Sequence, residues 1–412
     1  MLNSKNEREL AYLITVDAIE PIPGRDFTEC AVIGGWRTLV KKDVFKPGSI
    51  GIYIEIDSKT PEKEPFDFLE KYHYKVKTQK FKTFYSQGLL MAPEDFGWQV
   101  ESGWTTNTSK ETGATFFVVD ENGQRHSVDD DSRFLTSQLG ITYATAEDNK
   151  RKAPSADKYK KMAQRHPDLF KKKWARWMMK HEWGKKVMFF FFGKKKDKRT
   201  WPAHIAAKTD VERIQNCIWL LNDKQPYIAS EKIDGCSCSV MAEKTKFNKI
   251  KYYVCSRNVV FEDENQKCFY EDNVYFEAYN KYNLKDKITQ ILNDYHLPNV
   301  AIQMEIFGPG IQKRDYSLTD HQIRVFHIVS EGKKMPMDKV IEICEKYNLP
   351  HVPILDDNYI LPDTIEELQT YVESRGSEID NKEKEGIVFY DKQTGQTYFK
   401  FVSPSFLMKY HQ

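Results

Sequence analysis

The first hundred residues alternate hydrophobic and polar positions in short runs. Isoleucine occupies every second position from 50 to 56, which is the period-two pattern of a strand with one buried face. Further strand-like runs span residues 10–16, 30–40 and 88–92, and turns rich in proline and glycine separate them. About five short strands in this length predict a small β-barrel.

A basic run lies on the predicted barrel at residues 75–85, KVKTQKFKTFY, where lysines are interleaved with Phe81, Phe84 and Tyr85. Cations that meet phosphates, beside rings that stack on bases, suit a single nucleic-acid strand. The same residues also fit an exposed basic edge strand whose aromatic side chains join the core. Such a strand on a small barrel favours an OB-fold.

The second half of the chain mixes strands with helices. Hydrophobic spacing of three and four predicts helices over 284–292, 340–344 and 365–372. The last helix has a start signal, because Asp363 can cap it and Glu366 follows three residues later. Strands are predicted at 227–229, 237–241, 252–255, 301–307, 324–329, 386–390 and 398–402.

The net charge of +2 over 412 residues hides a local excess of positive charge. Residues 151–200 contain 18 lysines and arginines against four acidic residues. This local field suits a polyanion such as nucleic acid, although a solvated linker can have the same composition. Within it, residues 171–186 carry three tryptophans and predict a basic amphipathic helix that contacts RNA, a membrane surface or a neighbouring domain.

Composition also argues against several classes of protein. The seven cysteines include no CxxC pair, so neither a disulfide framework nor a zinc site is indicated. The longest apolar run, residues 187–192, is far shorter than the roughly 20 residues that cross a bilayer. We therefore expect a soluble, monomeric protein of the cytoplasm or nucleoplasm, with no membrane partner.

One short motif carries candidate chemistry: EKIDG at 231–235 lies between two predicted strands. A lysine held on strand-flanking backbone, with Gly235 beyond it to let the chain approach a ligand, suits a nucleophile that attacks a nucleotide phosphate. Because a free lysine is protonated at neutral pH, Lys232 needs a lowered pKa, which Lys400 and a divalent ion would provide. Taken alone, K-x-D-G is more often a surface turn.

The order of six motifs resembles that of the covalent nucleotidyltransferase superfamily of ligases and capping enzymes. In addition, KTDVERIQN at 208–216 resembles the element that precedes the nucleophile in RNA ligases. Six matches in the family's order are hard to attribute to chance. The motifs are EKIDG (231–235), SRN (256–258), QMEIFG (303–308), VFHI (325–328), EGIV (385–388) and FKFV (399–402).

The N-terminal part resembles the OB domain of Naegleria-type RNA ligases, which precedes their nucleotidyltransferase domain. The resemblance implies an OB-fold RNA-binding domain at 1–103, a basic linker or insertion at 104–200 and an adenylyltransferase domain at 201–412. The fold would be α+β, with an OB-fold β-barrel followed by ATP-grasp-like antiparallel sheets plus helices. The matching runs are GGW (34–36), VKK (40–42), FKPG (45–48), YIEIDS (53–58) and YSQGLL (85–90).

The resemblance also implies roles for individual residues. Lys232 would attack the α-phosphorus of ATP, and Lys400 would neutralise charge on that phosphate. Glu305 and Glu385 would serve the ribose and a divalent ion, Mg²⁺ or Mn²⁺, partly through waters. The other nucleotide-binding residues would be Glu231 at the adenine amino group, Phe326 under the adenine, Arg257 at a phosphate with Asn258 nearby, and Asp234, Gly235 and Lys208.

Two positions depart from the family pattern. Many relatives carry a second lysine where Val402 stands. The site here would therefore place one positive charge fewer at the phosphate. His327 stands where aspartate is common, and a structural histidine is the simplest interpretation. Each single residue also has a plainer alternative: the two glutamates as surface acids, Arg257 as a solvated arginine and Phe326 as a core ring.

We therefore predict an ATP-dependent RNA ligase. It would seal 3′-hydroxyl and 5′-phosphate ends of nicked or broken RNA through lysyl-AMP and RNA-adenylate intermediates, in RNA repair. DNA ligases and capping enzymes share this chemistry but need an OB domain after the catalytic domain, and only 12 residues follow Lys400. A non-catalytic RNA-binding protein would have lost the key side chains, whereas both lysines and both glutamates are present.

Overall fold

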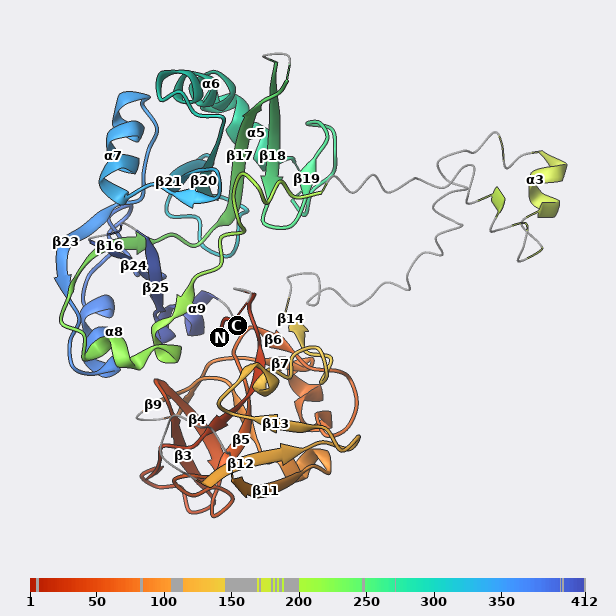
Figure 1. The fold of residues 1–412 in the computed structure, drawn as a ribbon, viewed down its shortest axis with the longest axis vertical. Helices are drawn as coiled ribbons and strands as arrows, with labels where there is room; N and C mark the ends of the chain where they lie inside the picture. Colours follow the sequence, from red (N-terminus) through yellow and green to blue (C-terminus); the bar gives the residue numbers. More distant parts are fainter. Residues whose placement is uncertain are drawn as a thin grey trace. The chain divides into compact units, whose positions relative to one another are not determined.

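The computed structural model describes residues 1–4, 7–81, 84–104, 114–144, 200–246, 249–270, 272–392, 394 and 396–410, and also 169, 172–178, 181, 184, 187 and 188. The chain divides into two compact units. One unit combines residues 1–143 with 200–412, and the other is residues 144–199. Figure 1 draws the N-terminal barrel in red to orange and the C-terminal domain in green to blue.

The N-terminal part folds as a barrel of short strands, as the period-two pattern predicts. The isoleucine-rich strand is buried along its whole length, so the expectation of a single buried face is wrong for it. The strand predicted over 30–40 is instead two strands, because the chain turns at Gly34, whose φ of 57° lies in the left-handed region. The strands pair in the orders β1 (Ala11–Thr15)–β5 (Ile50–Ile54)–β10 (Leu89–Met91), β2 (Ala18–Pro21)–β3 (Thr28–Ile33)–β4 (Trp36–Lys41), β8 (Gln79–Phe81)–β9 (Phe84–Ser86) and β14 (Thr142–Tyr143)–β6 (Ser58–Lys59)–β7 (Lys75–Val76).

Part of the segment predicted as a linker over 104–200 belongs to the barrel. Val118, Leu135 and Ile141 are buried in the same core as Ile52. Burial of these side chains, rather than a regular sequence pattern, attaches the described residues up to 143 to the N-terminal domain. Their strands form the sheet β11 (Gln99–Trp104)–β12 (Ala114–Val119)–β13 (Arg125–Ser127), and the short helices of this domain are η1 (Asp67–Tyr72), η2 (Pro93–Phe96) and η3 (Asp131–Arg133).

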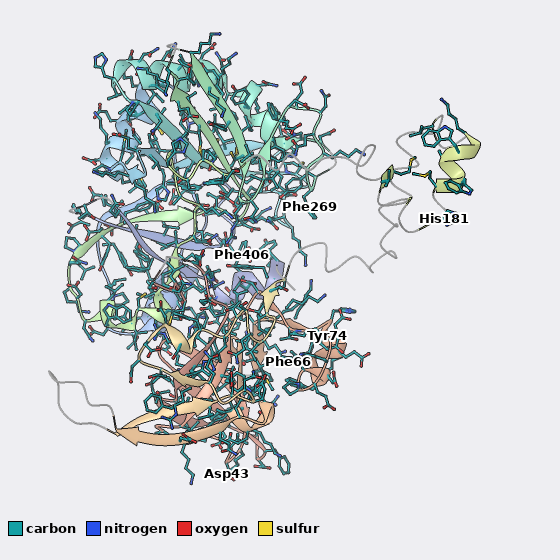
Figure 2. All side chains as sticks on the ribbon, turned by 45° about the vertical axis from the view of Figure 1, so that its right-hand side comes forward. Asp43, Phe66, Tyr74, His181, Phe269 and Phe406 are labelled. Carbon is teal, nitrogen blue, oxygen red and sulfur yellow. The ribbon has the colours of Figure 1, made fainter. Side chains whose placement is uncertain are left out.

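The unit of residues 144–199 includes α3 (Lys173–Met178), which lies inside the helix predicted over 171–186. Trp177 is 54% exposed, and its ring meets that of His181 at 5.0 Å between centroids (Figure 2). Most of the predicted helix lies outside the described residues. In the part of the chain that the structure describes, no helix is long and apolar enough to cross a membrane.

The C-terminal domain has two sheets with helices packed on them, which confirms the α+β class. Helices α6 and α7 share a core with the six-stranded sheet, and α8 shares a core with the five-stranded sheet. Thr364, not the predicted Asp363, caps α8, since its Oγ1 accepts from the amide of Glu367 at 3.2 Å. The sheets are β19 (Val260–Phe261)–β18 (Ile250–Ser256)–β17 (Cys236–Lys244)–β20 (Asn299–Phe307)–β21 (Gln322–Ser330)–β22 (Lys333–Lys334) and β15 (Glu212–Arg213)–β25 (Thr397–Val402)–β24 (Gly386–Asp391)–β16 (Pro226–Lys232)–β23 (Ile354–Ile360); the helices are η5 (Ile214–Asn216), η6 (Ile218–Leu221), α5 (Val274–Lys281), α6 (Leu284–Asp294), α7 (Met337–Lys346), α8 (Ile365–Glu373) and α9 (Pro404–Tyr410).

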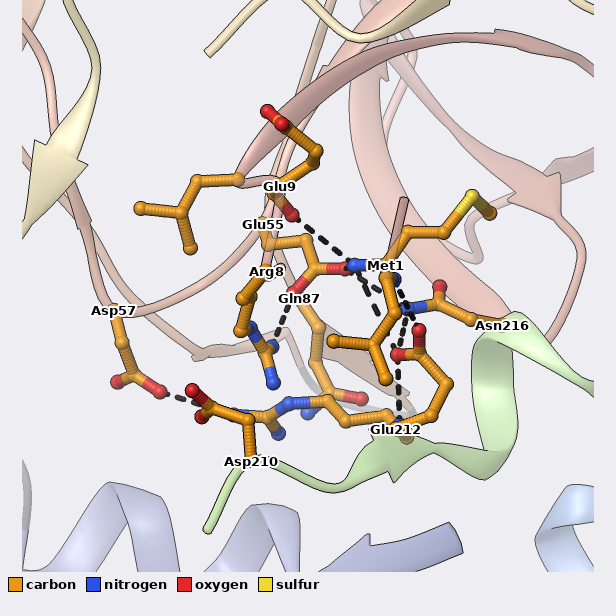
Figure 3. Close-up of polar contacts among 12 residues, drawn as sticks. Met1, Arg8, Glu9, Glu55, Asp57, Gln87, Asp210, Glu212 and Asn216 are labelled. Atoms are coloured by element: carbon orange, nitrogen blue, oxygen red, sulfur yellow. Dashed lines mark hydrogen bonds and ion pairs between the residues drawn. The ribbon is translucent and has the colours of Figure 1, made fainter. Parts of the chain in front are cut away.

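A buried hydrogen-bond network joins the barrel to the C-terminal domain (Figure 3). The side-chain oxygen of Asn216 accepts from Trp36 Nε1 at 2.6 Å and from the Tyr12 hydroxyl at 3.1 Å, and its amide nitrogen donates to Glu55 at 2.9 Å. Glu55 also forms an ion pair with Arg8. Burial opposes ionisation of Glu55, but Arg8, the terminal ammonium and a second arginine hold its pKa well below the ordinary value.

The GGW run explains how the two domains approach so closely. The amide of Gly35 donates to the carbonyl of Gln215 at 2.9 Å. A Cβ at position 35 would lie 2.6 Å from the Cα of Gln215, so a side chain there would push the domains apart. The glycine pair thus places Trp36 within reach of Asn216.

We expect Asn216→Ala to destabilise this junction. The substitution leaves the buried Trp36 Nε1 without its acceptor, which costs about 1–3 kcal/mol, while Glu55 keeps its ion pair with Arg8. The measurement is the midpoint of thermal or urea unfolding, with the exposed Asn222→Ala as the matched control. Equal midpoints for the two variants would show that the network contributes nothing to stability.

Candidate active site

A cavity of about 560 Å³ opens between strands of the two sheets of the C-terminal domain. Ten of the eleven predicted site residues line it, and Lys208 is the exception. The motifs are far apart in sequence but come from strands that face one another. The predicted residues in the lining are Glu231, Lys232, Asp234, Gly235, Arg257, Asn258, Glu305, Phe326, Glu385 and Lys400.

Lys232 is the last residue of β16, and its side chain points into this cavity. Its Nζ lies 2.6 Å from an Oε of Glu385, and the lysine side chain is 23% exposed. Burial lowers the pKa of Lys232, but the carboxylates of Glu385 and Glu305 raise it above the ordinary value. The expected lowering by Lys400 is therefore wrong for the protein's own side chains, because the carboxylates outweigh it.

This electrostatic balance predicts the pH dependence of any reaction in which Lys232 is the nucleophile. Only the neutral amine attacks, and with a raised pKa the amine is a small fraction at neutral pH. We expect the rate of covalent nucleotide transfer to Lys232 to rise by about tenfold per pH unit below that pKa. Initial rates between mildly acidic and mildly alkaline pH test this, and a rate that falls with pH would contradict it.

The turn after Lys232 is held by the loop that follows β20. The amide of Asp234 donates to the hydroxyl of Tyr316 at 2.7 Å, and Gln312 Nε2 donates to the carbonyl of Gly235 at 2.9 Å. A Cβ at Gly235 would lie 2.3 Å from the carbonyl oxygen of Ile306. Glycine is required here for close approach, so the K-x-D-G pattern is a packed turn and not a surface one.

The two glutamates of the prediction flank the lysine from different sheets. Burial raises the pKa of Glu305 to about 8; Lys232 opposes this effect and Glu385 adds to it. Glu305 is therefore largely protonated near neutral pH, and an added cation would favour its ionised form. Among the described residues, no group of three or more His, Cys, Asp or Glu side chains is arranged to hold a metal ion.

Lys400 lies on β25, in register with Arg213 of β15. Burial lowers the pKa of Lys400 well below the ordinary value, and Arg8, Arg213 and Lys232 lower it further. Buried like charges repel unless an anion lies between them. This end of the cavity is therefore suited to an anionic group such as phosphate.

Two family models match the chain. Residues 10–93 match the PHA02142 OB-fold domain, and residues 225–410, which hold most of the cavity lining, match the RNA ligase family. The C-terminal domain is thus similar to the RNA ligase family over most of its length.

Solved structures of Naegleria gruberi RNA ligase share the fold of this chain over its whole length. A mutant with AMP and Mn has a TM-score of 0.66 at 22% identity, covering 98% of this chain and 99% of that one. A mutant with ATP and Mn has a TM-score of 0.65 at 22% identity with 98% coverage of each. The enzyme with PPi has a TM-score of 0.66 at 23% identity, covering 98% and 99%. No curated protein matches the chain. The predicted Naegleria-type architecture, with an OB-fold before the ligase domain, is confirmed.

Glu231, which the resemblance places at the adenine amino group, also has partners within the protein. Both carboxylate oxygens of Glu231 accept hydrogen bonds, from Ser377 Oγ at 2.5 Å and from the amide of Glu378 at 2.8 Å. Glu231 therefore anchors the turn before β24, besides lining the cavity. His327 contacts Gln303 at 3.2 Å, and burial holds its pKa well below the ordinary value, so it is a neutral histidine at physiological pH.

The mouth of the cavity is built by residues of both domains. Arg257 forms an ion pair with Asp210, and its guanidinium lies 5.1 Å from the ring centroid of Tyr143 of the barrel. Lys208 reaches the site through Asn258, whose Oδ1 accepts from Lys208 Nζ at 3.0 Å. The predicted residues thus lie together at the cavity, although Lys208 contacts it only through Asn258.

Several residues of the site escaped the sequence analysis. Asp210 and Arg213 lie inside the KTDVERIQN run and were quoted there, but no role followed from the run itself. Tyr316 and Gln312 lie in a loop without periodicity, and Arg8 belongs to the other domain. Only the folded chain brings such residues close to Lys232.

Proposed function

We propose that this protein is an ATP-dependent RNA ligase that joins 3′-hydroxyl and 5′-phosphate ends through AMP bound to Lys232. The observation that carries the proposal is the arrangement of Lys232 between Glu305 and Glu385 in a cavity with Lys400 at its anionic end. The RNA ligase family match and the ATP, AMP and Mn of the Naegleria gruberi structures support it.

In the first step, Lys232 Nζ attacks the α-phosphorus of ATP. An N–P bond forms, the bond from the α-phosphorus to the bridging oxygen breaks, and pyrophosphate leaves. The lysine must lose a proton, and Glu385 at 2.6 Å is in position to receive it. Lys400 neutralises the charge that builds on the phosphate, with Arg8 and Arg213 beside it.

The residues present fit a divalent ion of the magnesium type. Such an ion is bound by one or two carboxylates together with substrate phosphates and waters, and Glu305 and Glu385 supply that number. A bound ion would lower the pKa of Lys232 and add positive charge at the α-phosphate.

The two later steps use the same side chains. The 5′-phosphate of the RNA attacks the adenylated lysine, which frees Lys232 and gives an RNA-adenylate. The 3′-hydroxyl then attacks the RNA phosphate, an O–P bond forms and AMP leaves. Each step is a transfer at phosphorus, where positioning and charge neutralisation provide most of the catalysis. Sealing of broken RNA would serve repair.

We assign the remaining contacts to the nucleotide. Phe326 would stack under the adenine and Glu231 would lie at its edge, while Asp234 and Gly235 shape the turn that presents Lys232. Arg257 would meet a phosphate at the mouth, held by Asp210, and Lys208 would act by holding Asn258.

Two incubations test the function. The full chain is mixed with ATP labelled at the α-phosphate and a divalent ion, then with 5′-phosphorylated nicked RNA, nicked DNA or open RNA ends. We expect label on the protein, then sealed RNA and released AMP. Labelling by GTP and not by ATP would favour a capping reaction, and sealing of DNA alone would favour a DNA ligase.

A further inference from the structure

We infer that one face of the barrel binds single-stranded RNA by stacking on its unpaired bases. The inference rests on the proposed function for the identity of the partner. The face consists of Arg25, Phe27, Lys41, Lys42, Phe81 and Phe84, and is called the ring face below. None of its residues lines the nucleotide cavity.

Aromatic side chains are held out toward solvent on this face. Phe27 is 83% exposed, the highest value among the exposed large hydrophobic residues that the structure describes. Phe81 and Phe84 are a cross-strand pair of the β8–β9 hairpin and stack with 5.8 Å between ring centroids, each half-buried. An exposed ring gains little from folding, so the Phe27 ring is available for a partner, and the partly exposed ring pair extends the same face.

Cations alternate with the rings. The guanidinium of Arg25 lies 4.8 Å from the centroid of Phe81, which links the turn between β2 and β3 to the hairpin. Lys42 donates its amide to the carbonyl of Phe27 at 3.0 Å, and Lys41 pairs with Thr28 across β3 and β4. Both lysines are exposed at the end of β4.

The hairpin lies against β4 on the side away from β3. The amide of Leu39 donates to Ser86 Oγ at 2.9 Å, and the amide of Gln87 donates to the carbonyl of Arg37 at 2.8 Å. The two lysines at the end of β4 therefore stand between the exposed ring of Phe27 and the ring pair of the hairpin. Asp43, which directly follows them, marks this end of the barrel in Figure 2.

This pattern favours nucleic acid over a protein partner. Lysine is depleted in the cores of protein–protein interfaces, whereas rings that stack on bases beside cations that meet phosphates are the usual means of binding single strands. Paired bases hide their faces in the duplex, so the rings select unpaired RNA. The acids Asp26, Glu29 and Asp43 lie beside the three cations, and Glu29 accepts from the amide of Asp43 at 2.6 Å. The stacking rings, and not an excess of positive charge, therefore carry the inference.

The test measures RNA affinity and nucleotide transfer separately in the full chain. A fluorescent, unstructured RNA of about 16 nucleotides is titrated without ATP. We expect the double variant Phe81→Ala with Phe84→Ala, and Phe27→Ala alone, each to raise the Kd by about 5- to 100-fold. Labelling of the protein by ATP should stay within about twofold, since no ring-face residue touches the cavity.

A matched control exists on the same domain. Phe68 is 52% exposed but lies in η1, where Asp67 and Glu70 surround it with negative charge. We expect Phe68→Ala to leave the Kd unchanged. In addition, Lys41→Ala with Lys42→Ala should lower the slope of log Kd against log salt by about 0.7 for each lysine.

Three outcomes would overturn the inference. These are an unchanged Kd in all ring-face variants, an equal loss in Phe68→Ala, or an equal loss of affinity for duplex RNA. Phe27→Ala keeps the test valid if the hairpin variant misfolds, because the Phe27 side chain is almost fully exposed. Failure of the proposed function looks different: the wild-type chain would then bind no label from ATP, whatever its RNA affinity.

Discussion

Lys232→Arg is expected to abolish covalent labelling of the protein by ATP. Arginine keeps the positive charge beside Glu385 and can keep the ion pair, but its guanidinium stays protonated at any pH the protein tolerates and cannot attack phosphorus. Loss of the nucleophile in covalent catalysis lowers the rate by about 10⁴-fold or more. The measurement is the amount of protein-bound label after incubation with α-phosphate-labelled ATP and a divalent ion.

A substrate that bypasses the first step provides the control for this variant. The last step forms no bond to Lys232, so Lys232→Arg should still seal a synthetic RNA-adenylate to a 3′-hydroxyl. If the variant takes up label at a wild-type rate, Lys232 is not the nucleophile. If it fails on both substrates and also unfolds, Lys232→Met replaces it as the neutral alternative.

Lys400→Met is expected to slow nucleotide transfer by about 10²–10³-fold, the effect of removing one charge-stabilising group from a transition state. Methionine has a similar length and no charge, so the cavity keeps its shape. The reduction should appear in the rate at saturating ATP, because the negative charge that Lys400 neutralises is greatest in the transition state.

The stability of this variant separates catalysis from folding. Burial and the neighbouring cations hold the pKa of Lys400 well below its ordinary value, so the folded state disfavours the protonated lysine. Removing a charge that folding disfavours should leave the unfolding midpoint unchanged or higher, unlike most substitutions at buried sites. The exposed Lys346→Met on α7 is the matched control. A lowered midpoint together with lost activity would indicate a structural role.

Regular patterns made much of the fold predictable. Alternating isoleucines identified β5, and spacing of three and four identified α6, α7 and α8. Other elements carry weaker signals. The strand β23 (ILDDNYI) is mostly half-buried or exposed and has polar residues at its centre, and α5 (VYFEAYNK) is rich in aromatic residues that suit strands as well as helices. Neither was predicted.

The site was predictable where its residues are consecutive in a motif and not where the fold assembles them. Lys232, Glu305 and Lys400 each lie on a strand and Glu385 directly precedes one, each in a recognisable motif, so the order of the motifs singled them out. Arg8 adds charge beside Lys400 from another domain, and Tyr316 holds the nucleophile turn from a loop. The direction of the pKa of Lys232 was also missed, because it depends on the distance to Glu385, which no sequence pattern encodes.

Glu305 and Glu385 control the protonation of Lys232. Without an added cation they keep Lys232 protonated and leave Glu305 with a pKa of about 8. If Lys232 is the nucleophile, as proposed, the site keeps it inactive until positive charge enters the cavity. A divalent ion that arrives with the nucleotide would join activation of Lys232 to substrate binding.

The most direct test of the account is to locate the bound nucleotide. The wild-type chain is incubated with ATP and a divalent ion, digested, and its peptides are sequenced by mass spectrometry under conditions that preserve the phosphoramide bond. The account predicts one AMP, on the Nζ of Lys232. AMP on another residue, or RNA sealing without any adenylated lysine, would contradict it.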